Sequence, residues 1–147
     1  MPPRILIADD SLNVRTALHQ LLSHIQPAEF VDAGNGQEAV SKALEFRPGV
    51  VILDFVMPVM DGLTVARKIL QHLPQTAIFI CTMHWSRYLE EEAAAVGVRQ
   101  VISKAQSSIL VAAVEQVLKA QPPSADADPD PASPDSTAKD RPDPARP

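Results

Sequence analysis

Five short apolar runs, each followed by an amphipathic segment, dominate the first 120 residues of this 147-residue chain. The runs cover residues 4–8, 29–33, 50–54, 77–81 and 100–103, and three of them are nearly continuous Ile, Leu and Val. Such runs are typical of parallel strands that are covered on both faces, because neither face then needs to be polar. The alternation predicts one α/β domain built from five strand–helix units.

The segments between the runs carry the spacing of amphipathic helices. The first has apolar residues at helical spacing from Val14 to Ile25 and ends before Pro27, which cannot continue a helix. Further helices are predicted over residues 36–46, 63–73, 85–96 and 107–119, with Asn35 as a cap for the second and Gly97 ending the fourth. Five such units favour a doubly wound parallel sheet with right-handed crossovers and strand order 2-1-3-4-5.

A polar residue that can do chemistry stands directly after four of the apolar runs. Asp9 and Asp10 follow the first, Asp54 ends the third, Thr82 follows the fourth and Lys104 follows the fifth. The carboxyl ends of parallel strands meet at one edge of the sheet, where ligands bind. The sequence therefore predicts one pocket that holds three carboxylates, a hydroxyl and an ammonium, suited to a divalent cation and a phosphoryl group.

The paired carboxylates have two interpretations. Asp9 and Asp10 alone could cap the helix that follows, because acidic groups are favourable near a helix N-terminus. With Asp54 at a neighbouring strand end, a metal site is the stronger interpretation, since buried carboxylates need a counter-charge and Mg²⁺ prefers oxygen ligands. The backbone carbonyl of Val56 is a further candidate ligand.

The same residues suggest a covalent reaction. A carboxylate beside Mg²⁺ can attack phosphorus and form an acyl phosphate, which makes Asp54 the candidate phosphoacceptor. Lys104 would supply a positive charge to the phosphoryl oxygens, and the Thr82 hydroxyl could donate a hydrogen bond to one of them. Lysine and threonine at strand ends are ordinary surface residues when they occur singly, so their combination with Asp54 carries the interpretation.

Composition excludes several classes of function. The formal net charge is −5 and there is no Lys/Arg block, so we expect no direct nucleic-acid partner. No apolar stretch approaches the ~20 residues that cross a bilayer, and Met1-Pro2-Pro3-Arg4 leads directly into a strand, so we expect a cytoplasmic protein without a signal peptide. The one cysteine, Cys81, lies in a predicted strand and is interpreted as a small buried apolar residue.

The composition changes near Gln121. Residues 121–147 contain eight of the fourteen prolines and six aspartates, but no Leu, Ile, Val, Met or aromatic residue. Such a segment cannot bury enough apolar surface to offset the entropy of ordering it. We predict a folded domain over residues 1–120 and a disordered Pro/Asp/Ala-rich tail, whose role as a docking segment stays open.

The chain resembles the response-regulator receiver domain of bacterial two-component signalling over about residues 3–120. The resemblance rests on Ile-Leu-Ile-Ala-Asp-Asp ending at Asp10, on Asp-Phe-Val-Met-Pro-Val-Met-Asp-Gly from Asp54 to Gly62, on Thr82, and on Ile-Ser-Lys ending at Lys104. It implies a flavodoxin-like fold and a phosphorylation-activated switch. Asp54 would accept a phosphoryl group from a histidine kinase or phosphotransfer protein, with Mg²⁺ held by Asp9, Asp10 and Asp54.

The resemblance also implies sensing of the phosphoryl group by Lys104 and Thr82, and output through the surface formed by the fourth helix, the fifth strand and the fifth helix. No helix-turn-helix pattern or second apolar core follows Lys119, so we expect a stand-alone switch that alters binding to an unidentified output partner. Dimerisation through the same surface stays open.

Four positions depart from the family pattern. Val101 stands where receivers commonly have an aromatic residue, Ala105 replaces the usual proline with its cis bond and should be trans, and the bulky Met83 replaces a small residue. Val56 cannot hydrogen-bond an attacking water as an amide side chain could. From Val56 and Met83 we expect a long-lived phosphorylated form, although His84 could orient water if it is not simply a solvated loop residue.

Two other functions are consistent with parts of the pattern. An aspartate-nucleophile phosphatase would need a second Asp two residues after Asp54, where this chain has Val56, so we expect no enzyme beyond self-phosphorylation and autodephosphorylation. A constitutive interaction module would leave the pocket unused, and the Asp54→Asn variant would then bind partners unchanged.

Overall fold

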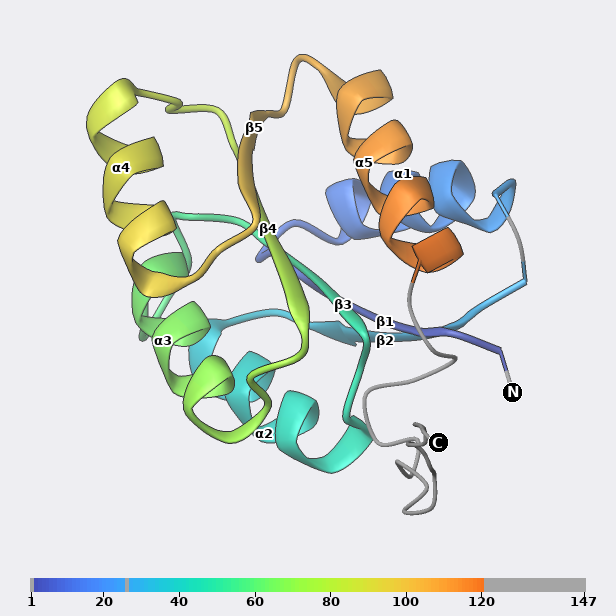
Figure 1. The fold of residues 1–147 in the computed structure, drawn as a ribbon, viewed down its shortest axis with the longest axis horizontal. Helices are drawn as coiled ribbons and strands as arrows, with labels where there is room; N and C mark the ends of the chain where they lie inside the picture. Colours follow the sequence, from blue (N-terminus) through green and yellow to red (C-terminus); the bar gives the residue numbers. More distant parts are fainter. Residues whose placement is uncertain (1, 26, 121–147) are drawn as a thin grey trace, which may run out of the picture.

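A single five-stranded parallel sheet forms the centre of the computed structural model, which describes residues 2–25 and 27–120 (Figure 1). The strands are β1 (Arg4–Ala8), β2 (Glu29–Ala33), β3 (Val50–Leu53), β4 (Ala77–Thr82) and β5 (Gln100–Ser103). All four neighbouring pairs are parallel and the order is β2-β1-β3-β4-β5. The doubly wound, flavodoxin-like fold and the 2-1-3-4-5 order predicted from the sequence are confirmed.

Helices cover both faces of the sheet (Figure 1). One face carries α1 (Leu12–Ser23) and α5 (Ser107–Ala120), and the other carries α2 (Gly36–Phe46), α3 (Gly62–His72) and α4 (Arg87–Val96). Each helix presents an apolar stripe to the sheet, such as Leu18 and Leu22 of α1. Because strand side chains alternate between faces, the sheet separates two apolar layers.

Strands β3 and β4 are buried along their whole length, and β1 is buried except at Arg4. The side chains of Ile5, Ile7, Ile52 and Phe79 lie in the layer under α1 and α5 and expose 1% or less of their surface. Each fully buried residue of this size contributes about 1.5–3 kcal/mol from removal of apolar area from water. The central sheet therefore gives a rigid support for whatever stands at its edges.

Side-chain caps fix where the helices begin and end. The oxygens of Ser11, Asn35, Asp61 and Ser86 accept hydrogen bonds from the backbone N–H three residues later. Gly97 ends α4 with a φ of 109°, a conformation that glycine adopts without strain. The predicted caps Asn35 and Gly97 are confirmed.

The boundaries of several elements differ from the predicted ones by one to three residues. β3 ends at Leu53, before Asp54, whereas β4 continues through Thr82. The first helix ends at Ser23, although its apolar spacing continues to Ile25. Because Ser86 caps α4, the predicted start at Trp85 is wrong and Trp85 lies in the preceding loop.

The predicted tail, residues 121–147, lies outside the described residues. Within the described part of the chain, no helix is long and apolar enough to span a bilayer.

Candidate functional site

The register of the central strands places Asp9 and Asp54 side by side. Ala8 at the end of β1 pairs with Leu53 at the end of β3, so the next residue of each strand leaves the sheet at the same level. The N–H of Asp54 donates to the carbonyl of Ala8 at 2.9 Å, which continues the pairing one residue further. The predicted convergence of the first and third strand ends follows from this register.

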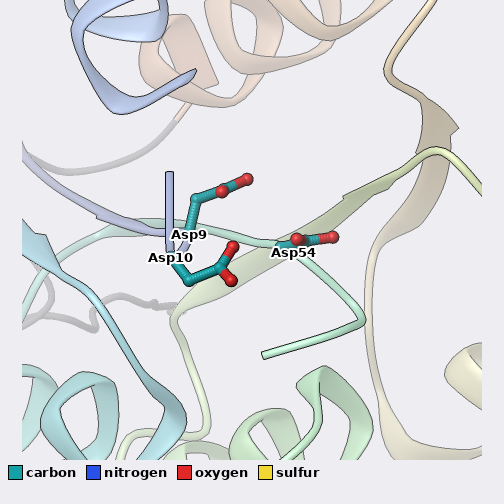
Figure 2. Close-up of side chains that lie close together, drawn as sticks. All are labelled: Asp9, Asp10 and Asp54. Carbon is teal, nitrogen blue, oxygen red and sulfur yellow. The ribbon is translucent and has the colours of Figure 1, made fainter. Parts of the chain in front are cut away.

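Three carboxylates gather at this edge (Figure 2). One oxygen from each of Asp9, Asp10 and Asp54 lies within 4.8 Å of the others. Asp9 and Asp54 are buried, with exposures of 3% and 8%, while Asp10 is exposed. The pocket therefore opens to solvent on the side of Asp10.

Lys104 supplies positive charge to the buried carboxylates. Its Nζ lies 2.8 Å from Oδ2 of Asp9 and 3.3 Å from Oδ2 of Asp54. Burial alone would lower the pKa of Lys104, but the hydrogen bond and charge of Asp9, together with Asp54, raise it. One ammonium therefore faces two buried carboxylates, which leaves negative charge in excess.

The electrostatics of Asp54 show the consequence of that excess. Burial raises the pKa of the Asp54 carboxyl above 3.8, and the charge of Asp9 raises it further, while Lys104 and the backbone N–H of Val56 oppose the change. Carboxylates that repel one another favour a bound cation, and an all-oxygen, partly hydrated donor set suits Mg²⁺. The residues of this cluster fit such an ion.

Thr82 is fully buried at the end of β4, opposite Ser103 in the register with β5. Its Oγ1 accepts a hydrogen bond of 3.0 Å from the N–H of His84. The hydroxyl hydrogen remains available as a donor, because accepting a bond does not use it. The hydroxyl is thus linked to the β4–α4 loop rather than to Asp54.

The loop after Asp54 lies close against the strand end. A Cβ added at Gly62 would stand 2.6 Å from the carbonyl oxygen of Asp54, so only glycine allows this approach. The Gly62 N–H donates to the carbonyl of Phe55 at 2.8 Å. This contact fixes the path of the loop that carries Val56, whose carbonyl remains a predicted metal ligand.

Two side chains that depart from the family pattern, the bulky Met83 and the Val56 that offers no hydrogen bond to water, are exposed. Val56 is 55% exposed and Met83 is 70% exposed. They belong to the loops that follow β3 and β4, on the same edge as Asp54. Both side chains are therefore directed largely to solvent.

Three smaller predictions can be compared with the structure. Cys81 is buried, and burial raises its thiol pKa to about 11, as expected for an inert packing residue. The described residues contain no cis peptide bond, which confirms a trans bond before Ala105. Ser11 caps α1, while Asp9 accepts from the Ser11 N–H, so Asp9 and Asp10 are not needed as caps.

One participant was not identified from the sequence. Arg15 of α1 donates through Nη1 to the backbone carbonyl of Asp9 and through Nε to Oδ2 of Asp32 at 3.1 Å. Arg15 stands three and seven residues before Leu18 and Leu22, on the face that α1 turns toward the sheet, and a charged residue there could have suggested a partner on a neighbouring strand. The identity of that partner depends on the register between β1 and β2.

Comparisons with known proteins agree with this geometry. The family model described as "Response regulator receiver domain" matches residues 5–115. The chemotaxis protein CheY of Thermotoga maritima is 32% identical over 120 residues, which span 81% of this chain and all of that protein.

Other relatives match over part of their length. A protein-glutamate methylesterase/protein-glutamine glutaminase of Caldanaerobacter subterraneus is 42% identical over 81 residues, or 54% of this chain, but the match spans only 22% of that protein. Among solved structures, a LuxR-family two-component response regulator from an Aurantimonas species has a TM-score of 0.75 at 27% identity, covering 82% of this chain and 88% of that one. CheY4 of Vibrio cholerae has a TM-score of 0.73 at 28% identity, covering 80% and 100%.

Proposed function

The chain belongs to the response regulator receiver domain family, and from this premise we propose that it is a phosphorylation-activated switch whose phosphoacceptor is Asp54. A histidine kinase or a phosphotransfer protein would supply the phosphoryl group. Phosphorylation would change the surface formed by α4, β5 and α5, and that surface would then bind an output partner that the sequence does not identify. The observation that carries the proposal is the group of three carboxylates with oxygens within 4.8 Å of one another, two of which, Asp9 and Asp54, are bridged by Lys104.

The reaction that this pocket supports is transfer of a phosphoryl group to a carboxylate. An oxygen of Asp54 forms a bond to phosphorus while the bond from phosphorus to the donor nitrogen of phosphohistidine breaks, and the imidazole leaves with its electron pair and takes up a proton. A bound Mg²⁺ would neutralise charge on the phosphoryl oxygens. Asp9 and Asp10, with Asp54 and the Val56 carbonyl, are the groups proposed to hold it.

The position of Lys104 supports a role in stabilising phosphorylated Asp54. Its Nζ lies 3.3 Å from Asp54 Oδ2, and it is 17% exposed, so little rearrangement would bring it to a phosphoryl oxygen. A compact ammonium with three donors can serve Asp9 and a phosphoryl oxygen at once. This gives Lys104 the proposed role of stabilising the acyl phosphate.

The link from the pocket to the surface would run through Thr82. Its hydroxyl accepts from His84 in the β4–α4 loop, so a reorientation of Thr82 toward a phosphoryl oxygen would disturb that loop. Val101 occupies the position of the aromatic residue that the family commonly uses to report such a movement. Trp85, in the loop before α4, and Tyr88, in the first turn of α4, are 47% and 72% exposed and are the proposed reporters in this chain.

An unused pocket or a phosphatase is less consistent with the same residues. A phosphatase would need an acid two residues after Asp54, and Val56 has no proton to donate. A constitutive interaction module gives no reason for two buried carboxylates to share a partly exposed lysine. The proposed protein is therefore a cytoplasmic signalling protein rather than an enzyme that turns over a substrate.

The proposal is tested by treating the protein with acetyl phosphate and Mg²⁺ and measuring its intact mass together with Trp85 fluorescence. We expect an adduct of one phosphoryl group and a change in fluorescence, both absent from Asp54→Asn. Acetate replaces imidazole as the leaving group in this assay. An adduct that forms equally on Asp54→Asn, or no adduct with either acetyl phosphate or a phosphorylated histidine donor, would contradict the proposal.

The expected lifetime of the phosphorylated form is a separate part of the proposal. Val56 offers no hydrogen bond to an attacking water, so we expect hydrolysis over minutes or longer, and faster hydrolysis in Val56→Asn. Decay followed by intact mass after removal of the donor measures both. Complete autodephosphorylation of the parent within seconds would contradict the expectation, and a slower His84→Ala variant would then assign the hydrolysis to His84.

A further inference from the structure

We propose that Arg15 is a positioning residue of the acidic pocket, and that the Arg15–Asp32 ion pair sets the affinity of the pocket for a divalent cation. The inference rests on the metal site of the proposed function and adds two residues to it that touch neither the cation nor the phosphoryl group. The observation behind it is that the Arg15 guanidinium contacts Asp32 of β2 on one side and the backbone carbonyl of Asp9 on the other.

The position of Arg15 is fixed by its two contacts. Nη1 donates to the backbone carbonyl of Asp9, and Nε donates to Asp32 Oδ2 at 3.1 Å. The side chain is only 16% exposed, so its charge depends on these partners more than on water. A planar guanidinium holds its donors in a fixed fork, which makes one contact depend on the other.

The carbonyl that Arg15 holds belongs to the peptide group between Asp9 and Asp10. Because a peptide group is planar and rigid, fixing its oxygen also fixes the direction in which Asp10 leaves it. The Asp9 carboxylate has its own restraints, from the Ser11 N–H at 2.9 Å and Lys104 at 2.8 Å. Within the described part of the chain, the Asp10 carboxylate has no hydrogen bond or ion pair of that kind, so its orientation depends on the backbone that Arg15 restrains.

Asp32 is the anchor of this arrangement. It lies on β2 opposite Ile7 of β1, which places it one residue before the level of Ala8. Arg15 and His19 are four residues apart on α1 and therefore share a face of the helix. Arg15 binds Oδ2 of Asp32 and His19 binds Oδ1, so one carboxylate ties two turns of α1 to the sheet.

His19 provides a matched comparison for Arg15. Its ring packs on Phe30 of β2 with centroids 4.6 Å apart and it contacts Asp32, but among the described residues it has no hydrogen bond or ion pair with Asp9. A variant of His19 removes part of the attachment of α1 to β2 and leaves the guanidinium fork intact. A variant of Arg15 removes the link to the pocket itself.

Electrostatics alone would predict the opposite result from positioning. Arg15 is a positive charge near a cation site, so its removal would strengthen Mg²⁺ binding if charge were its only contribution. If Arg15 positions Asp10, its removal weakens binding, and loss of an outer partner of this kind typically lowers metal affinity about 10–100-fold. The sign of the change therefore separates the two roles.

The experiment is a calorimetric titration of the full chain with Mg²⁺, with thermal unfolding measured on each variant in EDTA. We expect Arg15→Gln and Asp32→Asn to weaken Mg²⁺ binding at least fivefold, with no further loss in the double variant, because both remove the same link. Arg15→Lys, which keeps the charge and one donor group, should recover part of the affinity. His19→Gln should bind Mg²⁺ within twofold of the parent.

Each other outcome overturns the inference. Unchanged or tighter binding by Arg15→Gln would assign only a charge effect to Arg15, and equal weakening in His19→Gln would assign a general loosening of α1. Asp10→Asn separates this failure from failure of the proposed function. If Asp10→Asn loses Mg²⁺ while Arg15→Gln keeps it, only the positioning role is wrong; if the parent does not bind Mg²⁺, or if Asp10→Asn binds like the parent, the metal site itself is wrong.

Discussion

The two edges of the sheet satisfy their polar groups in different ways. At the amino edge, the buried Thr76 hydroxyl donates to the Pro48 carbonyl at 2.9 Å, and Arg4 donates to the Phe46 carbonyl at 3.0 Å while lying over the Phe46 ring. At the carboxyl edge, Asp9 and Asp54 share one lysine. The first edge is complete within the chain, whereas the second carries negative charge that a ligand would balance.

This difference indicates how stability and function are divided in the domain. At the amino edge the Thr76 hydroxyl and the Pro48 carbonyl are both neutral, so their hydrogen bond responds weakly to pH, salt and cations. Like charges at the carboxyl edge respond to all three, because their interaction is electrostatic and partly exposed. Substitutions at the two edges should therefore differ in sign and in their dependence on Mg²⁺.

The largest effect is expected at the carboxyl edge when its one ammonium is removed. Lys104→Met leaves two buried carboxylates without a counter-charge, and we expect a loss of about 3 kcal/mol in the free energy of unfolding. Urea unfolding in EDTA measures the loss, and saturating Mg²⁺ should reduce it. Lys68→Met, at an exposed position of α3, is the control and should stay within about 0.5 kcal/mol of the parent. A loss below 1 kcal/mol in Lys104→Met would mean that the carboxylates do not depend on this charge.

The amino edge should lose stability without any dependence on cations. Thr76→Val keeps the shape of the side chain but leaves the Pro48 carbonyl without its donor, and we expect a loss of about 2 kcal/mol. The same unfolding experiment should give equal losses in EDTA and in Mg²⁺, with the exposed Thr16→Val as control. A loss that changes with Mg²⁺ would contradict the proposed independence of the two edges.

Removing a charge from the carboxyl edge should have the opposite sign. Asp54→Asn removes a carboxylate that its burial and the charge of Asp9 both disfavour, and we expect a gain of roughly 1 kcal/mol in EDTA, the usual size of a single-substitution effect. Saturating Mg²⁺ should reverse the order of the two proteins, because the parent binds the cation more tightly. A less stable Asp54→Asn in EDTA would show that Lys104 fully compensates Asp54.

The pH dependence of the same pair of proteins follows from the raised pKa of Asp54. A carboxyl whose pKa is raised on folding holds its proton more tightly in the folded state, so its contribution to stability is complete below 3.8 and is lost as the pH rises through the folded-state value. The parent and Asp54→Asn should therefore converge in acid and separate as the pH rises. Unfolding in EDTA across this range tests the direction, and a gap that narrows with rising pH would contradict it.

The sequence predicted the fold well because its signals are local or topological. The apolar runs and helix spacings are local, and the strand order follows from five successive units of that kind. Asp9, Asp54 and Lys104 could be placed together because strand ends in a parallel sheet share an edge. The same argument predicted that Lys104 and Asp9, which are 95 positions apart in the chain, lie in one pocket.

The features that were missed depend on atomic register and on backbone angles. The Arg15–Asp32 pair exists because β2 pairs with β1 so that Asp32 faces Ile7, and no spacing in the sequence fixes that register. The start of α4 moved because Ser86 rather than an earlier residue accepts the first capping bond. Strained backbone positions are likewise invisible in a pattern of apolar and polar residues.

Two non-glycine residues with a positive φ, one near each edge of the sheet, allow the comparison with the smallest expected effect. Val59, in the loop after Asp54, has a φ of 75°, and Arg47, before β3 at the amino edge, has a φ of 54°. Both are in the left-handed region, but a β-branched side chain is more strongly disfavoured there. We expect Val59→Gly to raise the free energy of unfolding by about 1 kcal/mol and Arg47→Gly to raise it by about 0.5 kcal/mol. Glycine removes the backbone strain of the folded state, but it also raises the entropy of the unfolded chain, which offsets part of that gain.

The effect on phosphorylation should distinguish Val59→Gly from Arg47→Gly. Val59 is 72% exposed in the loop that follows Asp54, so no packing in the described domain accounts for a strained valine there. Strain that persists without a packing reason points to a role in contact or in geometry at the pocket. We expect a protein donor to phosphorylate Asp54 more slowly in Val59→Gly than in the parent, whereas acetyl phosphate should phosphorylate both at the same rate. Arg47→Gly should change neither rate. Equal rates for both variants with the protein donor would show that the strain at Val59 affects stability alone.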